Sequence, residues 1–347
     1  MTVQDTAAAA LGGARAGGTG PSEGGGRLSQ IGAGVFRIRE LSVLLVNIIL
    51  IIYFAIANPS FLTAGNISNI ADFFSSVAII AAAEVFLLIC GEIDLSAGMT
   101  FALVPIIMVT LNNNGLPLGL ALVISLAIAV VIGLFNGLVN QYLKLPSFIA
   151  TLGTLYVLHG VALKIAGSTP LPAPTSGFLV GIFGGFHWSE LVWALAIGVI
   201  LQIVLTQTRW GAHTIATGAN AIGASEAGIR VSWVKIRAFV LTAFVAGIAG
   251  ILDGTHIAQS FDPNAGGSEL MFTAIASAVI GGTLLIGGSG TVIGALLGAL
   301  LLAVLEDGFN IQGVSATTFV IVEGAAILLA MTLNIYLSRF RRRAKEQ

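Results

Sequence analysis

Long apolar runs alternate with short polar stretches along most of this chain. A transmembrane helix needs roughly 20 mainly apolar residues, with about 17–25 as the usual range. Ten segments fit: 41–58, 73–90, 95–111, 117–140, 146–166, 190–208, 237–256, 269–287, 290–306 and 314–338. The third and ninth are short, so we expect each to be tilted, re-entrant or broken. The pattern predicts an all-α polytopic bundle of about ten helices, or of eight plus two re-entrant segments.

Composition agrees with a membrane location. Of the 347 residues, 56% are hydrophobic and only 9% are charged, and the mean hydropathy is +0.98. A soluble domain carries about 25% charged residues, so most of this exterior must face lipid. We therefore expect a disordered cytoplasmic tail over residues 1–40, a membrane domain over 41–338 and a basic cytoplasmic tail over 339–347.

The basic residues are clustered, which predicts the orientation. Lys and Arg concentrate before residue 40, in 209–236 and its flank, and after residue 338. Basic loops stay in the cytoplasm, so both termini, Lys144 and 209–236 are expected inside. Residues 168–189 and 257–268 are then outside, and Lys164 is the exception among the basic residues. A cytoplasmic anchor explains the basic tail better than binding to nucleic acid.

The sequence carries no motif for ATP binding and no positive sign of a catalytic site. No lysine follows a glycine, so the phosphate-binding motif G-x-x-x-x-G-K-[ST] does not occur. The histidines show no metal-ligand spacing, and the single Cys90 excludes a multi-cysteine metal site. We expect a protein that is not an enzyme and has no cofactor or metal of its own.

Polar residues inside the predicted spans are the better functional lead. A carboxylate at such depth costs at least about 2.5–3.5 kcal/mol and normally faces a cavity or a partner. Candidates for a translocation path are Glu84, Asp94, Ser96, Asn136, Asn140, Thr151, Thr154, His159, Asp253 and Glu323, with Asp72 and Glu269 at span edges. Uncharged hydroxyl and amide groups suit a neutral, hydroxyl-rich solute, but interhelical hydrogen bonding explains them equally well.

The stretch "GEIDLSAG" interrupts the apolar pattern at residues 91–98. Asp94 and Ser96 stand before an apolar helix, where such side chains cap free N–H groups. We therefore expect a break between two helices. Non-helical backbone at membrane depth is tolerated where protein or a water-filled cavity satisfies it, so the break is either a pathway element or a tight re-entrant turn.

Four ordered blocks make the chain resemble a known family. They are "GEIDLSAG", "GLFNGLVNQYLKLPSFIATLGT" at 133–154, "ATGANAIGASEAGI" at 216–229 and "VIGGTLLIGGSGTVIGALLGAL" at 279–300. Over about residues 41–338 the chain resembles permease subunits of bacterial ABC importers for monosaccharides of the ribose, galactose and xylose type. These belong to the branched-chain amino acid/ribose permease superfamily. Glu92 replaces the family's usual second glycine.

The resemblance implies a homodimer in the bacterial inner membrane that moves a sugar into the cytoplasm. A periplasmic or lipoprotein sugar-binding protein would dock outside, and an ABC ATPase subunit inside would bind the ATP and Mg²⁺. Residues 218–229 match the family's cytoplasmic coupling helix, with Asn220 as N-cap and Gly228 as stop. The coupling candidates are Gly218, Asn220, Ala224, Glu226 and Gly228.

Two alternatives stay open. Permeases for branched-chain amino acids or nucleosides resemble the same architecture. A secondary transporter driven by protons or sodium is motivated by Glu84, Asp253 and Glu323.

Overall fold

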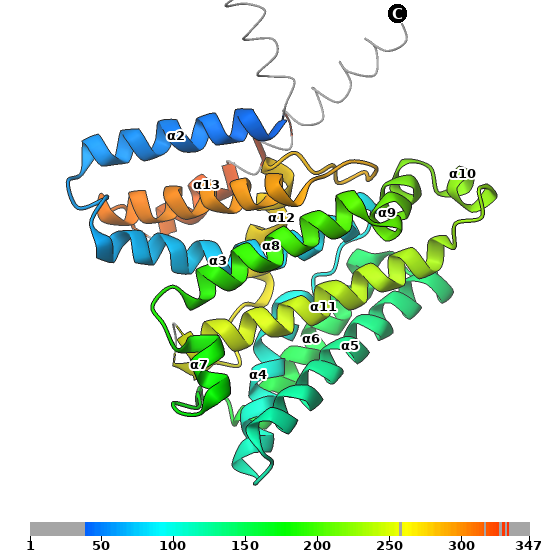
Figure 1. The fold of residues 1–347 in the computed structure, drawn as a ribbon, viewed down its shortest axis with the longest axis horizontal. Coiled ribbons are helices and arrows are strands. Elements are labelled where there is room, and N and C mark those ends of the chain that lie inside the picture. The colour runs from blue at the N-terminus through cyan, green and yellow to red at the C-terminus, as the bar shows by residue number, and fades with distance from the viewer. Residues whose placement is uncertain (1–38, 257–258, 316, 326–327, 330–331, 333–347) are drawn as a thin grey trace, which may run out of the picture. The chain divides into compact units, whose positions relative to one another are not determined.

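Helices occupy the predicted spans (Figure 1). The computed structural model describes residues 39–256, 259–315, 317–325, 328–329 and 332, which lie in one compact unit beginning at Arg39. The helices are α2 (Arg39–Ala57), α3 (Ala64–Ile89), α4 (Ala97–Asn113), α5 (Leu118–Tyr142), α6 (Ser147–Ala166), α7 (Phe178–Gly184), α8 (Ser189–Gln207), α9 (Arg209–Ala219), α10 (Ala221–Glu226), α11 (Val231–His256), α12 (Gly267–Ile280) and α13 (Val292–Ile311). Strands β1 (Leu171–Pro172) and β2 (Ser260–Phe261) form one antiparallel pair.

Seven of the described helices are long and apolar enough to cross a membrane, and α4 and α12 are shorter apolar helices. The short α4, with 17 residues, agrees with the sequence. The prediction that the ninth segment is short was wrong, because α13 has 20 residues. The short one is the eighth segment, since α12 stops after 14 residues at Gly281. Residues 317–325 of the tenth segment are helical. The end of that segment, the C-terminal tail (339–347) and residues 1–38 of the predicted N-terminal tail lie outside the described residues. Arg39 and Glu40, which the sequence assigned to the N-terminal tail, begin α2 instead.

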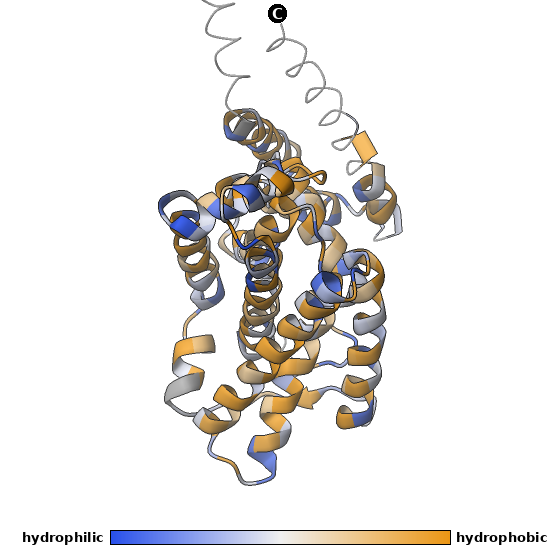
Figure 2. Ribbon diagram, turned by 90° about the vertical axis from the view of Figure 1, so that its right-hand side faces the viewer, coloured by the Kyte–Doolittle hydropathy of each residue, from blue (hydrophilic) through white to orange (hydrophobic). Residues whose placement is uncertain are grey.

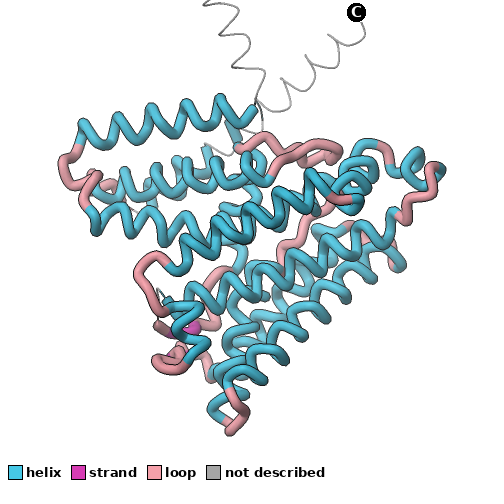
Figure 3. Tube along the Cα trace, in the orientation of Figure 1, coloured by secondary structure: helices cyan, strands magenta, loops and turns pink. Residues whose placement is uncertain are grey.

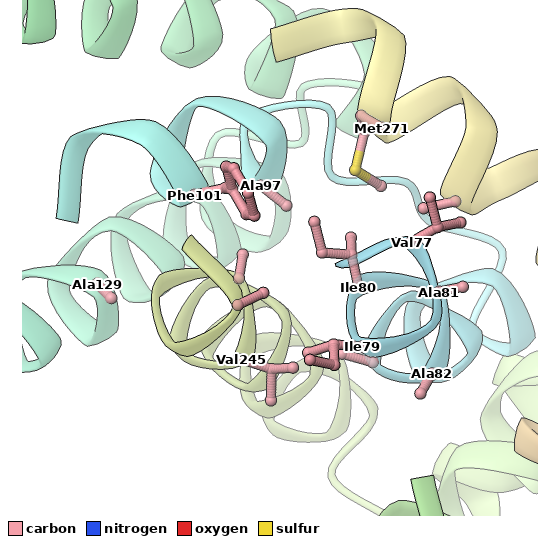
Figure 4. Packing of buried hydrophobic residues seen from close by; sticks show 14 of the residues in the cluster. Val77, Ile79, Ile80, Ala81, Ala82, Ala97, Phe101, Ala129, Val245 and Met271 are labelled. Carbon is pink, nitrogen blue, oxygen red and sulfur yellow. The ribbon is translucent and has the colours of Figure 1, made fainter. Parts of the chain in front are cut away.

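Helix α3 forms the centre of the bundle. Of its most apolar stretch 89% is buried, against 28% in α5 and in α6. A helix that is apolar on all sides and buried on all sides is expected in the core of such a bundle. Figure 4 shows Ile80 of α3 among Phe101 of α4, Val245 of α11 and Met271 of α12. Exposed apolar side chains cover the outer helices, which Figure 2 shows largely in orange.

Glycines let neighbouring backbones approach closely, as is common between membrane helices. A Cβ atom on Gly133 of α5 would lie 2.6 Å from the carbonyl oxygen of Phe239 on α11. A Cβ atom on Gly298 of α13 would lie 2.0 Å from the carbonyl oxygen of Ser277 on α12. Neither position tolerates a larger residue without a shift of the helices.

Loops join the helices at two ends of the bundle (Figure 3). At one end, which we call the basic end, Thr291 donates a hydrogen bond to Glu40, and the N–H of Gly288 donates to the carbonyl of Ile89. At the opposite end β1 pairs with β2. The loops predicted to lie inside meet at the basic end, and the two predicted to lie outside meet at the other, as alternation of the spans requires.

Candidate functional site

Residues 90–96, which we call the break, separate α3 from α4 as the sequence predicted. The segment turns back along α3, because the N–H of Asp94 donates to Glu84 Oε1 at 3.0 Å. Glu84 lies five residues before the end of α3, and the helix rises about 1.5 Å per residue. Asp94 is therefore about 8 Å inside the bundle from that helix end.

Side chains from neighbouring helices satisfy the backbone of the break. The N–H of Ile93 donates to Ser147 Oγ at 3.2 Å, and the N–H of Leu95 donates to Thr151 Oγ1 at 3.1 Å. With Glu84 accepting from Asp94, three successive N–H groups have side-chain acceptors. Such acceptors are what irregular backbone requires at membrane depth.

The side chain of Asp94 organises the start of α4. Its Oδ1 accepts the N–H of Ser96 at 3.0 Å and the Ser96 hydroxyl at 2.6 Å. The Asn136 amide donates to Ser96 Oγ at 2.7 Å, and Thr154 donates to Asn136 Oδ1 at 2.7 Å. Ser96 occupies the N-cap position without a capping bond from its side chain. The sequence offered both Asp94 and Ser96 as caps. The expectation for Ser96 was wrong, and the acceptor at the start of α4 is the side chain of Asp94.

The break brings six of the ten path candidates into one network: Glu84, Asp94, Ser96, Asn136, Thr151 and Thr154. All except Thr154 are buried. Glu84 Oε2 and Asp94 Oδ2 are buried and have no hydrogen-bond partner in the described chain. These two oxygens keep the capacity to accept a hydrogen bond from a water or a ligand.

Glu92 connects the break to α11. Its Oε1 lies 2.6 Å from Lys235 Nζ, and its Oε2 accepts from the Asn140 amide at 3.1 Å. The backbone at Glu92 is not in the positive-φ region, whereas Gly91 has φ +74°. The backbone therefore does not demand glycine at position 92, and the extra carboxylate has a cationic partner.

A separate cavity of about 510 Å³ lies among α3, α11, α12, α13 and residues 317–325. We call it the acidic cavity, because five carboxylates line it: Asp72, Asp253, Glu269, Glu306 and Glu323. The Ser76 hydroxyl lies 2.7 Å from Glu190 Oε1 and 3.1 Å from Asp253 Oδ1, and Thr273 donates to Glu323 at 2.7 Å. His256 Nε2 lies 4.0 Å from Asp72 Oδ1.

The acidic cavity unites two path candidates, Asp253 and Glu323, with the two span-edge residues Asp72 and Glu269. It has the size of a small-molecule site, and its carboxylates and hydroxyls can accept or donate hydrogen bonds. No group of three potential metal ligands occurs among the described residues. His159 joins neither group; its Nε2 lies 3.2 Å from Asn264 Oδ1, in the loop before α12.

Helices α9 and α10 form a separate segment at the basic end (Figure 1). Asn220 caps α10 as expected, since its Oδ1 accepts from the N–H groups of Ile222 and Gly223 at 3.1 and 3.0 Å. Gly228 follows the helix with φ +83°. The N–H of Ile229 donates to the carbonyl of Ala224, which makes the stop a Schellman motif.

Gly218 lies in the last turn of α9, outside the short helix α10. A Cβ atom there would lie 1.7 Å from the carbonyl oxygen of Ile89 and 2.6 Å from the nitrogen of Gly288. The end of α9 is thus pressed against the last residue of α3, where the break begins. By contrast, Glu226 and Gly228 are exposed, and Ala224 is buried.

Comparison with known proteins places the chain in a family. The family described as branched-chain amino acid transport system / permease component matches residues 66–331. The chain belongs to this permease family. It is 36% identical to the xylose/arabinose import permease of Sulfolobus acidocaldarius, over 88% of this chain and 87% of that protein. It is 35% identical to the ribose import permease of Bacillus subtilis, over 86% and 93%. No solved structure matches.

A third relative is named for the import of a different compound. The autoinducer 2 import permease of Salmonella typhi is 32% identical over 78% of each chain. Membership in the family and the seven long apolar helices make this chain a multi-pass membrane protein.

Several residues of the two sites were missed by reasoning from sequence. Glu190 follows Ser189 at the start of α8 and reads as an ordinary first-turn acid, yet it is only 1% exposed. Glu306 lies near the end of α13 and reads as a boundary residue. Lys235 served in the sequence analysis only as one of the basic residues of 209–236 that predict the orientation. These residues stand out because they are at least partly buried and have polar or charged neighbours on other helices. Neither the burial nor the neighbours can be recognised from the local sequence.

Proposed function

We propose that this chain is the membrane-spanning subunit of an ABC importer that moves a monosaccharide into the cytoplasm. The observation that supports this most is the similarity to the xylose/arabinose and ribose import permeases, which extends over most of each chain. A bacterial inner membrane is the proposed location, with the basic end in the cytoplasm because basic loops are retained there.

The driving energy would come from a partner ATPase that binds ATP and Mg²⁺. The sequence has no phosphate-binding loop of its own. Helix α10 is capped at both ends and is exposed at the basic end. It is therefore suited to insert as a rigid short helix into a groove on that partner. Gly218 lies against Ile89, so a push on α9 and α10 would reach the break directly.

The sugar would enter from the side opposite the basic end, delivered by a binding protein. The acidic cavity suits a hydroxyl-rich solute, because carboxylates accept hydrogen bonds from hydroxyl groups and charged acceptors make the stronger bonds. A second copy of the chain would complete the path, with the break of each copy supporting its wall. Asp253 and Glu323 are the side chains proposed to contact the sugar.

Reconstitution tests the proposal. Proteoliposomes that contain this chain, its ATPase and its binding protein should take up xylose or ribose only with internal ATP. Uptake of leucine or a nucleoside in place of sugar would favour the first alternative. Uptake that survives without the ATPase and collapses with an uncoupler would instead establish an ion-coupled secondary transporter.

A further inference from the structure

A second cavity, of about 570 Å³, lies at the basic end between α9 and the start of α11. We call it the basic pocket. Its polar and aromatic lining residues are His213, Arg230, Trp233 and Arg237, and Gly228 and Ile229 also line it. It shares no lining residue with the acidic cavity.

The positive charge of the basic pocket is not neutralised within the described chain. The ion pairs formed by the described residues are Lys235–Glu92 and His256–Asp72. Lys235 lies on the same helix but pairs with Glu92 in the break. Arg230 and Arg237 are exposed and have no carboxylate partner among the residues that the structure describes. Two guanidinium groups that share a cavity repel each other, so an anion between them is favourable.

The geometry of the basic pocket suits a phosphate group. Arginine presents a planar fork of donors that matches phosphate oxygens. The pocket also includes the residue just before α11, a helix of 26 residues, and the start of a helix attracts anions. These features add to the two arginines and favour one bound phosphate.

The position of the basic pocket relative to the membrane surface points to a lipid as the source of that phosphate. Trp233 is 47% exposed, and tryptophan concentrates at the headgroup level of membranes. Gly137 of α5 contacts Ile236 of α11, so the exposed Tyr142 and Leu143 at the end of α5 lie near the same level. An acyl chain at this level therefore finds exposed apolar surface on α5.

We propose that the basic pocket binds the headgroup phosphate of an anionic phospholipid from the leaflet at the basic end. Basic pockets between helices at the cytoplasmic side are a recognised form of lipid site. This site shares no lining residue with the acidic cavity, and it adjoins the coupling segment at Gly228.

Lipid binding to the purified full-length protein tests the proposal. Native mass spectrometry in detergent would compare added phosphatidylglycerol with phosphatidylcholine, and the wild type should retain phosphatidylglycerol preferentially. The double variant Arg230→Gln/Arg237→Gln should bind phosphatidylglycerol about thirtyfold more weakly, since two basic contacts to the anionic headgroup are lost. Arg209→Gln is the matched control, because Arg209 is exposed on the same segment but does not line the pocket.

Several results would overturn the proposal. Equal retention of the two lipids by the wild type would do so without any variant, which covers the case of a double variant that fails to fold. Unchanged binding in a folded double variant, or the same loss in Arg209→Gln, would remove the assignment to this pocket. Displacement of phosphatidylglycerol by millimolar inorganic phosphate would make free phosphate the ligand. Normal lipid binding with lost ATPase capture would assign the pocket to the ATPase.

Discussion

The salt bridge between Glu92 and Lys235 should couple the break to α11, and a double-mutant cycle can measure that coupling. Glu92→Gln keeps the shape and removes the charge, and Lys235→Met keeps the stem and removes the ammonium group. Lys235 lies in the second turn of α11, and α11 is the helix that follows α10 in the chain. We therefore expect the pair to affect both stability and transport.

The magnitude follows from the burial of the pair. The Nζ–Oε1 distance is 2.6 Å, and the two side chains are 17% and 12% exposed. Exposed pairs contribute about 0.2–1 kcal/mol, whereas breaking a buried pair costs about 3–5 kcal/mol. Each single variant should therefore lose about 1–3 kcal/mol of unfolding free energy. The double variant should lose less than the sum, with a coupling energy of about 1–2 kcal/mol.

The assay is equilibrium unfolding in mixed micelles, with ATP-driven uptake as a second readout. Arg209→Met is the control, because Arg209 is exposed and has no ion pair among the described residues, and it should change stability by less than about 0.5 kcal/mol. If the double variant loses the full sum of the single losses, within about 0.3–0.5 kcal/mol, the pair is not coupled and the reasoning fails.

The remaining predictions concern the break and the coupling segment. Asp94→Leu removes the acceptor at the start of α4 and should impair uptake in a protein that still assembles; uptake at the wild-type level would reduce the break to an incidental turn. Gly218→Ala should destabilise by about 1–3 kcal/mol, as measured by unfolding, because no space exists for a Cβ atom. Gly228→Val meets no neighbouring atom, but φ +83° strains a branched residue; it should insert normally yet lose ATPase co-purification and uptake together, and normal ATPase capture would refute the role of α10. A cysteine at Glu226, in a Cys90→Ser background, should resist an impermeant thiol reagent added outside; external labelling would invert the topology.

Local rules predicted much of the coupling segment. The N-cap at Asn220 and the stop at Gly228 are both present, because each depends on hydrogen bonds within a few residues. The resemblance to the family extended the coupling helix back to Gly218, which lies instead in the last turn of α9. That glycine serves a contact with Ile89, far away in the sequence.

The sequence alone determined the helical spans, the grouping of the basic loops at one end and the existence of the break, since apolar length, charge clusters and local caps follow from neighbouring residues. Only the tertiary structure decided that Asp94, Asn136 and Thr154 share one network, and that Asp253 and Glu323 line another site. Which side chains meet depends on the rotation and depth of each helix. Close packing of glycines and apolar side chains on neighbouring helices sets both, and these contacts connect residues that are far apart along the chain.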